Sequence, residues 1–250
     1  MLKNFKPIII IAGDPKSIFL EIYFKSVKKI KSNRPLILVV NKDILLEQMR
    51  ALKYKFKINE LDANNLNFKN LSKKEINIIH VPYDKKYISK YIYESFEKAL
   101  LIIKKNKGTN LINGPINKKK ILKQNFLGIT EYLDFKTKRN GKTVMLIYNK
   151  KLSVSPLTTH LPLKNVYKHI NKEKIINHVE QITKFYSKQF NFKPKIAITG
   201  LNPHCESNYN KSEEEKIIIP SIKYLLKKKF KVSGPYAADT IFLKDKIKKF

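Results

Sequence analysis

The chain has little of several residue types, and each shortage narrows what it can be. Its 250 residues hold one cysteine and no tryptophan, and 20 acidic residues stand against 52 lysines and arginines. The single cysteine, Cys205, excludes an intrachain disulfide and a cysteine-rich zinc module, which agrees with a reducing compartment. Only seven glycines are present, and they do not form the glycine-rich fingerprint of dinucleotide-binding proteins.

Long hydrophobic runs are missing as well. The longest, Pro7 to Ala12 and Pro35 to Val40, are far shorter than the ~20 residues that a transmembrane helix needs. The amino terminus enters a strand-like run without the apolar region and cleavage pattern of a secretory signal. We therefore expect a cytoplasmic protein with no membrane partner. Hydrophobic residues still make up 42% of the chain, which is enough for a folded, enzyme-sized protein.

The formal net charge of +32 makes nucleic acid an alternative partner. The lysines, however, are spread over nearly the whole chain, as on a solvated surface, and do not form one arm or one helical stripe. Isoleucine and asparagine are frequent too, and they share A- and T-rich codons with lysine, so biased base composition is another explanation. We expect no specific nucleic-acid partner, only weak and salt-sensitive nonspecific binding.

Strand-like and helix-like segments alternate along the chain, which predicts an α/β fold with parallel strands joined by helices. Strands are expected at residues 6–12, 34–40, 76–81, 109–113 and 195–200. Helices are expected at residues 16–30, 86–105, 173–190 and 212–229. Two more strand-like runs flank a predicted hairpin turn at Asn149-Lys150, the second of them from Lys151 to Pro156. The polar stretch 59–74 is expected to be a surface excursion, and no linker separates the two halves.

Two histidine loops are the most informative functional signal. His160 lies in Thr158-Thr159-His160-Leu161-Pro162-Leu163, after the predicted strand 151–156. His204 ends Gly200-Leu201-Asn202-Pro203-His204, after the predicted strand 195–200. Ligands and catalytic groups collect at the carboxyl ends of strands in α/β sheets. Because imidazole is a common metal ligand, the two loops suggest a metal site.

Six short motifs occur in order along the chain. They are Gly13-Asp14-Pro15, Asn113 to Lys118, Thr130 to Leu133, Thr158 to Leu163, Leu201 to His204 and Gly234 to Thr240. With these motifs, essentially the whole chain resembles the 4-hydroxythreonine-4-phosphate dehydrogenase family. The resemblance implies a two-lobed α/β fold of the isocitrate/isopropylmalate dehydrogenase type, with residues 1–250 as a single family domain. It also implies a homodimer with the active site near the subunit interface.

The activity that the resemblance implies belongs to pyridoxal phosphate biosynthesis. It is the NAD-dependent oxidation of 4-phosphooxy-L-threonine to a ketone, followed by decarboxylation to 3-amino-2-oxopropyl phosphate. A divalent metal such as zinc, magnesium or cobalt would polarise the substrate hydroxyl and stabilise the enolate. By the match, the metal ligands are His160 and His204, the catalytic residues are Asp239 and Lys118, and the substrate-binding residue is Thr130.

Each of these residues has a structural alternative. Asp239 precedes a threonine and is also suited to cap a helix or turn, Thr130 to be a turn hydroxyl, and Lys118 to be one surface lysine among many. Asp14 can form an Asx turn before Pro15. Cys205 is expected to be a passive neighbour of His204, the alternative being a reactive or metal-seeking thiolate. The other histidines are outside the motifs and are expected to be structural: His80, His169 and His178.

Three departures from the family pattern affect the site. Ile129 stands where the family has a histidine before threonine and glutamate, which predicts weaker phosphate or carboxylate binding. Larger side chains at residues 16–21 replace family glycines and can block a close backbone approach. The family's third metal histidine lies downstream of Ala-Asp-Thr, so we expect the chain to be C-terminally incomplete. Two histidines leave a metal under-coordinated unless Asp239, Cys205 or a partner subunit supplies the rest.

Three other functions stay open. The chain can be a dehydrogenase of another phosphorylated hydroxy acid, which the change at Ile129 allows. It can be an inactive relative that binds a phosphorylated ligand or pairs with another subunit. A basic nucleic-acid-binding protein is the third alternative, and the scattered lysines argue against it.

Overall fold

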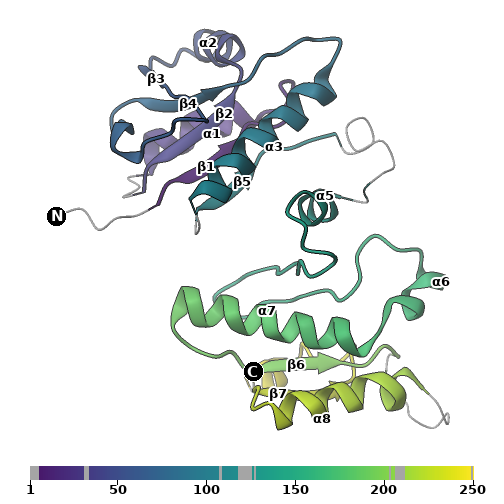
Figure 1. Cartoon of the computed structure of the whole chain (residues 1–250). Coiled ribbons are helices and arrows are strands. Elements are labelled where there is room, and N and C mark those ends of the chain that lie inside the picture. The colour runs from purple at the N-terminus through teal and green to yellow at the C-terminus, as the bar shows by residue number, and fades with distance from the viewer. Residues whose placement is uncertain are drawn as a thin grey trace. The chain divides into compact units, whose positions relative to one another are not determined.

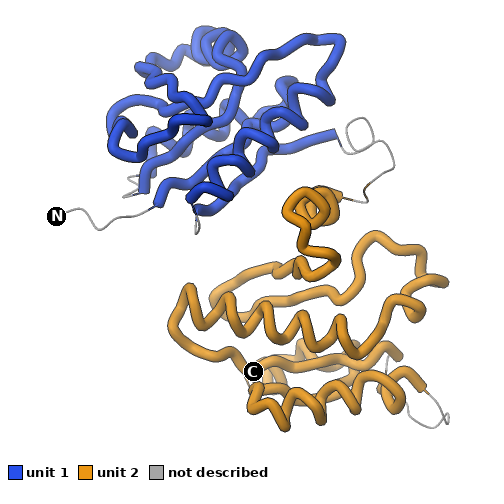
Figure 2. The backbone as a smooth tube through the Cα atoms, in the orientation of Figure 1, with its two compact units in different colours: residues 1–125 blue, residues 126–250 orange. Residues whose placement is uncertain are grey.

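The computed structural model describes residues 6–30, 34–106, 109–117, 126, 128–202, 204–205, 212–248 and 250. The chain divides into two compact units, residues 1–125 and 126–250 (Figure 2). The prediction of one family domain with two lobes stays a prediction. No helix in the described parts is long and apolar enough to cross a membrane.

The first unit is built on a parallel sheet (Figure 1). Its described strands are β1 (Ile8–Ile11), β2 (Leu36–Val40), β3 (Ile58–Glu60), β4 (Ile76–His80) and β5 (Asn110–Asn113). They are ordered β3-β4-β2-β1-β5, and each neighbouring pair is parallel. Short, continuous isoleucine, leucine and valine runs suit strands that are covered on both faces. The predicted α/β class with a parallel sheet is confirmed.

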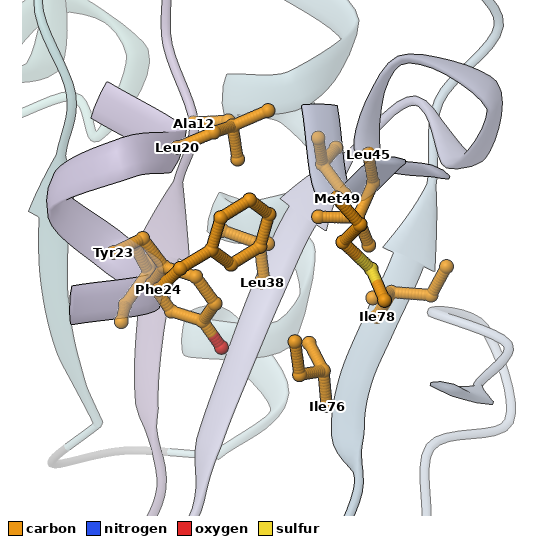
Figure 3. Packing of buried hydrophobic residues seen from close by; sticks show 11 residues of the cluster. Ala12, Leu20, Tyr23, Phe24, Leu38, Leu45, Met49, Ile76 and Ile78 are labelled. Atoms are coloured by element: carbon orange, nitrogen blue, oxygen red, sulfur yellow. The ribbon is translucent and has the colours of Figure 1, made fainter. Parts of the chain in front are cut away.

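Helices connect these strands. They are α1 (Phe19–Lys29), α2 (Lys42–Ala51), the short 3-10 helix η1 (Phe68–Asn70) and α3 (Ile88–Lys105). Helix α2 begins at Asn41, whose side chain accepts a hydrogen bond from the backbone N–H of Ile44. Side chains from α1, α2, β2 and β4 meet in one core, in which Phe24, Leu38 and Leu45 are fully buried (Figure 3).

The second unit has a smaller parallel sheet. Its described strands are β6 (Ile196–Thr199) and β7 (Val232–Tyr236), paired from Ile196 opposite Val232. Its helices are α5 (Ile129–Lys136), α6 (Leu163–Val166), the 3-10 helix η2 (Tyr167–His169), α7 (Lys172–Phe190), the π-helix η3 (Glu214–Ile218), α8 (Ile219–Lys227) and α9 (Lys244–Ile247).

A second core packs against strand β6. Val179 of α7, Leu225 of α8 and Val232 of β7 are buried in one cluster, against which Ile196 and Ile198 of β6 pack. The backbone N–H of Gly200 then donates to the carbonyl of Tyr236 at 2.9 Å. The exits of the two strands are therefore held side by side.

The predicted strand from Lys151 to Pro156 is wrong. The described residues there contain one isolated antiparallel bridge, between Ile147 and Val154. Serine side chains bond to the backbone in place of a ladder, since the Ser155 hydroxyl donates to the carbonyl of Met145 at 2.8 Å. His160 therefore does not follow a strand.

Other element boundaries also differ from the predictions. Helix α1 begins at Phe19 and not at Lys16, because the Asp14 carboxylate accepts from the backbone N–H of Lys16 and forms a turn first. The helix predicted at 212–229 opens with the π-helical turn η3. Strand β3 extends into the polar stretch 59–74, and β7 passes through Gly234-Pro235. Helix α2 lies in a segment for which no helix was predicted.

Candidate active site

His204 lies on a turn that follows strand β6, as predicted. The turn is closed by a hydrogen bond from the backbone N–H of Cys205 to the carbonyl of Asn202 at 3.1 Å. Asp239 lies on a turn after β7, and its Oδ2 is 3.3 Å from Nδ1 of His204. Parallel pairing of β6 with β7 thus brings together two of the residues that the motifs singled out.

This pair is a suitable proton-handling group. A carboxylate on one imidazole nitrogen orients the ring and stabilises its protonated form. The second nitrogen is then available to accept a proton or to bind a metal. The side chains are 66% and 43% exposed, so a substrate can reach His204 and Asp239.

Cys205 lies beside this pair in a left-handed backbone conformation, with φ of 55°. Burial raises the pKa of its thiol, and the nearby Glu214 and Asp239 carboxylates raise it further, although a hydrogen bond with Gly200 acts in the opposite direction. A raised pKa keeps the thiol protonated at neutral pH. These surroundings suit the expected passive neighbour better than a metal-seeking thiolate.

His160 lies at the start of helix α5 in the second unit. A Cβ atom built on Gly128, the residue before the helix, would lie 4.0 Å from the Cδ2 and Nε2 atoms of His160. Next to it, the Thr159 hydroxyl donates to Oε1 of Glu131 at 3.3 Å. His160 also has a left-handed conformation, with φ of 57°.

Thr130 is the second residue of α5 and so lies at the same end of the helix as His160. The first N–H groups of a helix have no partner inside it, and together with the helix dipole they attract anions. Thr130 adds a hydroxyl donor to this end of the helix. Ile129, which replaces the family histidine, takes the first helical position, so the imidazole expected there is absent.

The predicted metal site is not complete in the described residues. No group of three histidine, cysteine, aspartate or glutamate side chains among them is arranged to hold a metal ion. His204 and Asp239 offer two donors, whereas protein zinc sites use at least three. Lys118 lies outside the described residues. Asp14, in the first unit, forms the Asx turn that was its structural alternative.

The remaining histidines have structural surroundings. His80 accepts a hydrogen bond at Nδ1 from the backbone N–H of Lys42, at 3.2 Å. The His178 ring is 2.9 Å from the carbonyl of Lys174, and burial lowers the pKa of His178. His169 ends the short helix η2.

One residue beside the site was not predicted. Glu214 is fully buried, and its carboxylate accepts hydrogen bonds from Leu201 and Asn202, the residues that lead to His204. A signal was present, because Glu213-Glu214-Glu215 places three acids together in a strongly basic chain, shortly after the histidine loop.

A family model and related sequences match this chain to one family. The family model described as "Pyridoxal phosphate biosynthetic protein PdxA" matches residues 31–250. A relative from Sulfurihydrogenibium sp., named 4-hydroxythreonine-4-phosphate dehydrogenase, is 33% identical over 243 residues, which cover 92% of this chain and 74% of the relative. A protein from Fusobacterium nucleatum, provisionally named D-threonate 4-phosphate dehydrogenase, is 28% identical over 244 residues, covering 92% of this chain and 73% of that protein.

A solved structure supports the fold. The crystal structure of 4-hydroxythreonine-4-phosphate dehydrogenase from Klebsiella pneumoniae matches with a TM-score of 0.79 and 23% identity. The match covers 98% of this chain and 79% of that one.

Proposed function

The chain belongs to the pyridoxal phosphate biosynthetic protein PdxA family, and on this basis we propose that it is an oxidoreductase that dehydrogenates 4-phosphooxy-L-threonine with NAD. One observation carries the proposal: a family match over residues 31–250 in a chain whose motif residues His204 and Asp239 lie 3.3 Å apart. The pair supplies the base that alcohol oxidation needs.

Oxidation removes a hydride from the carbinol carbon and a proton from its oxygen. His204 accepts the proton, and the Asp239 carboxylate stabilises the imidazolium that results. Bound NAD would supply the hydride acceptor. The ketone produced is a β-keto acid, which loses carbon dioxide to give 3-amino-2-oxopropyl phosphate. The chain has no glycine-rich dinucleotide fingerprint, so NAD would bind by other residues.

The anionic end of the substrate is assigned to the start of helix α5. Thr130 offers its hydroxyl, and the first backbone N–H groups of the helix point the same way along its axis. A phosphate or carboxylate bound there neutralises the positive end of the helix dipole. Lys118 is proposed to add a positive charge to the same anions, and to take part in catalysis as the family match implies.

A divalent metal and a homodimer complete the proposal. His160 and His204 remain the proposed ligands, although the described residues do not assemble a closed site. Because Asp239 contacts Nδ1 of His204, only the other ring nitrogen is available, so the metal-ligand role and the base role of His204 are alternatives. Metal dependence is tested by turnover with added zinc, magnesium or cobalt and again after chelation. Light scattering of the purified protein tests the dimer.

The decisive experiment is NADH formation by the purified chain with 4-phosphooxy-L-threonine and NAD. We expect turnover that requires both compounds. Titration calorimetry with the same substrate accompanies the assay. Binding without turnover, with the protein folded by circular dichroism, would replace the proposal by an inactive ligand-binding relative, and neither binding nor turnover would contradict it outright.

A second substrate has a specific observation in its favour. Ile129 occupies the first position of α5, where the family resemblance expects a histidine, and the Fusobacterium nucleatum relative has a name with a different phosphorylated hydroxy acid. D-Threonate 4-phosphate is therefore the second substrate to assay. A higher kcat/KM for D-threonate 4-phosphate than for 4-phosphooxy-L-threonine would show that D-threonate 4-phosphate is the preferred substrate.

The substitution Ile129→His tests the effect of this position on either substrate. An imidazole beside Thr130 adds a donor for the substrate anion, so we expect kcat/KM to rise by about tenfold, the value of one added hydrogen bond to a charged group. Ile129→Asn is the matched control, since it adds polarity at the same position with a shorter reach. An unchanged kcat/KM in Ile129→His would show that position 129 does not contact the substrate.

A further inference from the structure

Glu214 is a buried carboxylate with unusual partners. Its side chain belongs to a residue with no exposed surface, at the first position of the π-helix η3. Removing a carboxylate from water is costly unless hydrogen bonds replace the lost hydration. The donors that the structure gives Glu214 are two backbone N–H groups and one side-chain amide.

All three donors come from the turn that leads to His204. Oε1 of Glu214 accepts from the backbone N–H of Leu201 at 2.8 Å and from that of Asn202 at 2.9 Å. Oε2 accepts from Nδ2 of Asn202, also at 2.9 Å. Burial alone would raise the pKa of Glu214, but the hydrogen bonds from Asn202 and Leu201 outweigh it and the pKa is lowered. The carboxylate therefore remains a charged acceptor, which forms stronger hydrogen bonds than a neutral one.

The space around the turn is also filled. A Cβ atom on Gly200 would lie 2.6 Å from Sγ of Cys205 and 3.0 Å from Oε1 of Glu214. The cysteine sulfur and the carboxylate oxygen therefore both lie against the same face of Gly200. The backbone of the turn has little freedom to move away from Glu214.

The His204–Asp239 pair needs such support. Both side chains are more than a third exposed, and an exposed ion pair contributes too little to fix two side chains in one geometry. The position of His204 must therefore come from its backbone. That backbone is held at Leu201 and Asn202 by Glu214, and at Gly200 by strand β7.

We infer that Glu214 is a positioning residue, whose buried carboxylate holds the Leu201–Asn202 turn so that the His204 imidazole stays against Asp239. This inference rests on the proposed function only for its effect on turnover. The hydrogen bonds themselves are testable without it.

Four variants separate positioning from other effects. Glu214→Ala removes all three hydrogen bonds, whereas Glu214→Gln keeps one oxygen that can accept from Leu201 and Asn202. Glu215→Gln is the matched control, since it makes the same charge change at the next, exposed side chain. Asn202→Ala leaves both backbone bonds in place and serves if Glu214→Ala does not fold.

The first readout is hydrogen exchange of the Leu201 and Asn202 amides by NMR, together with the nitrogen-15 shift of Nδ1 in His204. We expect exchange at least tenfold faster in Glu214→Ala than in Glu215→Gln, and an Nδ1 shift that moves toward that of free imidazole. Glu214→Gln should lie between them. Unchanged exchange, or an unchanged Nδ1 shift, would overturn the inference whether or not the protein turns over substrate.

The second readout is turnover of 4-phosphooxy-L-threonine. Loss of a group that orients a metal-ligating side chain typically costs 10–100-fold in metal affinity or activity. By analogy we expect kcat to fall by about that factor in Glu214→Ala while KM changes less than about threefold. Glu214→Gln should recover part of the loss. A fall that matches only the unfolded fraction, measured by circular dichroism, would mean a merely structural role. An inactive wild-type protein would contradict the proposed function, and the NMR readouts would still decide the role of Glu214.

Discussion

Two acidic residues of the second unit have opposite surroundings. Asp239 is 43% exposed beside His204, whereas Glu214 has no exposed surface and accepts hydrogen bonds from backbone. An exposed carboxylate can contact a substrate. A buried carboxylate whose hydrogen bonds are all made holds the donor groups in place. In the proposed function Asp239 acts on His204 by direct contact, and in the inferred positioning role Glu214 acts on it through the backbone of Leu201 and Asn202.

The exposed acid is tested by Asp239→Asn. The amide keeps the shape but loses the negative charge beside His204, so kcat/KM should fall by about 10–100-fold. The control is Asp245→Asn, which makes the same charge change at an exposed residue of helix α9. Equal activity of the two variants, measured by NADH formation, would contradict the assignment of Asp239.

Asp134 gives a prediction about pH. Its Oδ1 accepts from the backbone N–H of Thr143 at 2.9 Å, and its Oδ2 accepts from Gly141 at 2.6 Å. Burial would raise the pKa of Asp134, but the hydrogen bonds from Thr143 and Gly141 lower it below its ordinary value. As the pH falls, the Asp134 carboxylate therefore takes up its proton in the unfolded chain before it does so in the folded chain. The stability that Asp134 contributes is complete above about pH 5 and is lost as the pH falls through the lowered pKa.

The measurement is urea unfolding of the wild type and of Asp134→Asn at two pH values. Near pH 7 we expect the variant to be less stable by about 1 kcal/mol. The two backbone donors bond to different oxygens of Asp134, and an asparagine side chain has only one oxygen to accept either of them. At about pH 3 the difference should shrink toward zero. A difference that is constant with pH would mean that the ionised carboxylate is not what stabilises this segment.

At the scale of elements, the β6–β7 pair is the part of the second unit on which the site depends. Two glycines allow the strands to approach. Gly234 has φ of 131°, and a Cβ atom there would lie 2.3 Å from the carbonyl oxygen of Ile198. Gly200 has a similar lack of room where β6 meets the His204 turn. A side chain at Gly234 would require a shift of backbone, whereas one at Gly200 would first displace the side chains of Cys205 and Glu214.

Gly200→Ala tests this packing. The new methyl group collides with Cys205 and Glu214, so we expect a loss of about 1–3 kcal/mol in the free energy of unfolding and a lower kcat. The double variant Gly200→Ala/Cys205→Ala removes the nearer collision and should recover part of the stability. Urea unfolding measures both variants. A double variant no more stable than Gly200→Ala would show that Cys205 does not limit the space.

The elements that were predicted correctly are those with a strong local pattern. Apolar residues recur at helical spacing from Ile88 to Ile103, and helix α3 covers Ile88–Lys105. Strands β1 and β2 are continuous apolar runs. Helix α2 has a more polar sequence and was not predicted, although Asn41 at its start is a typical capping residue. The wrong strand at 151–156 shows that two serines can bond locally instead of joining a ladder.

The contact between His204 and Asp239 could not be predicted from the sequence. The motifs singled out His204 and Asp239, yet their approach depends on the parallel register of β6 and β7, which joins segments far apart in the chain. Periodicity has no information on that register. Glu214 was not predicted, because a row of three acids does not show which one will be buried.

At the scale of the whole molecule, charge is the dominant property. A formal net charge of +32 makes the folded chain repel itself. Dissolved salt screens such repulsion, because the Debye length falls from about 30 Å at 0.01 M to about 10 Å at 0.1 M. The stability of this protein should therefore depend on ionic strength more than that of a neutral protein of the same size.

We expect the urea midpoint of unfolding to rise between about 0.02 M and 0.3 M sodium chloride. Chloride is chosen because sulfate and phosphate also strengthen hydrophobic burial. The control is the same titration with potassium chloride, which at equal ionic strength screens charge equally and should give the same rise. A midpoint that is flat or falls with sodium chloride would mean that ion pairs, and not repulsion, dominate the surface.

The strand order of the first unit has a consequence for biosynthesis. Strand β1 pairs with β2 on one side and with β5 on the other, where Ile8 lies opposite Asn110. A ribosome makes these two partners about 100 residues apart, which at 5–20 residues per second takes roughly 5–20 seconds. During that interval β1 has one edge without its strand partner, and an apolar edge is a template for pairing with other chains. Nascent chains of this protein are thus most prone to aggregate before β5 leaves the ribosome.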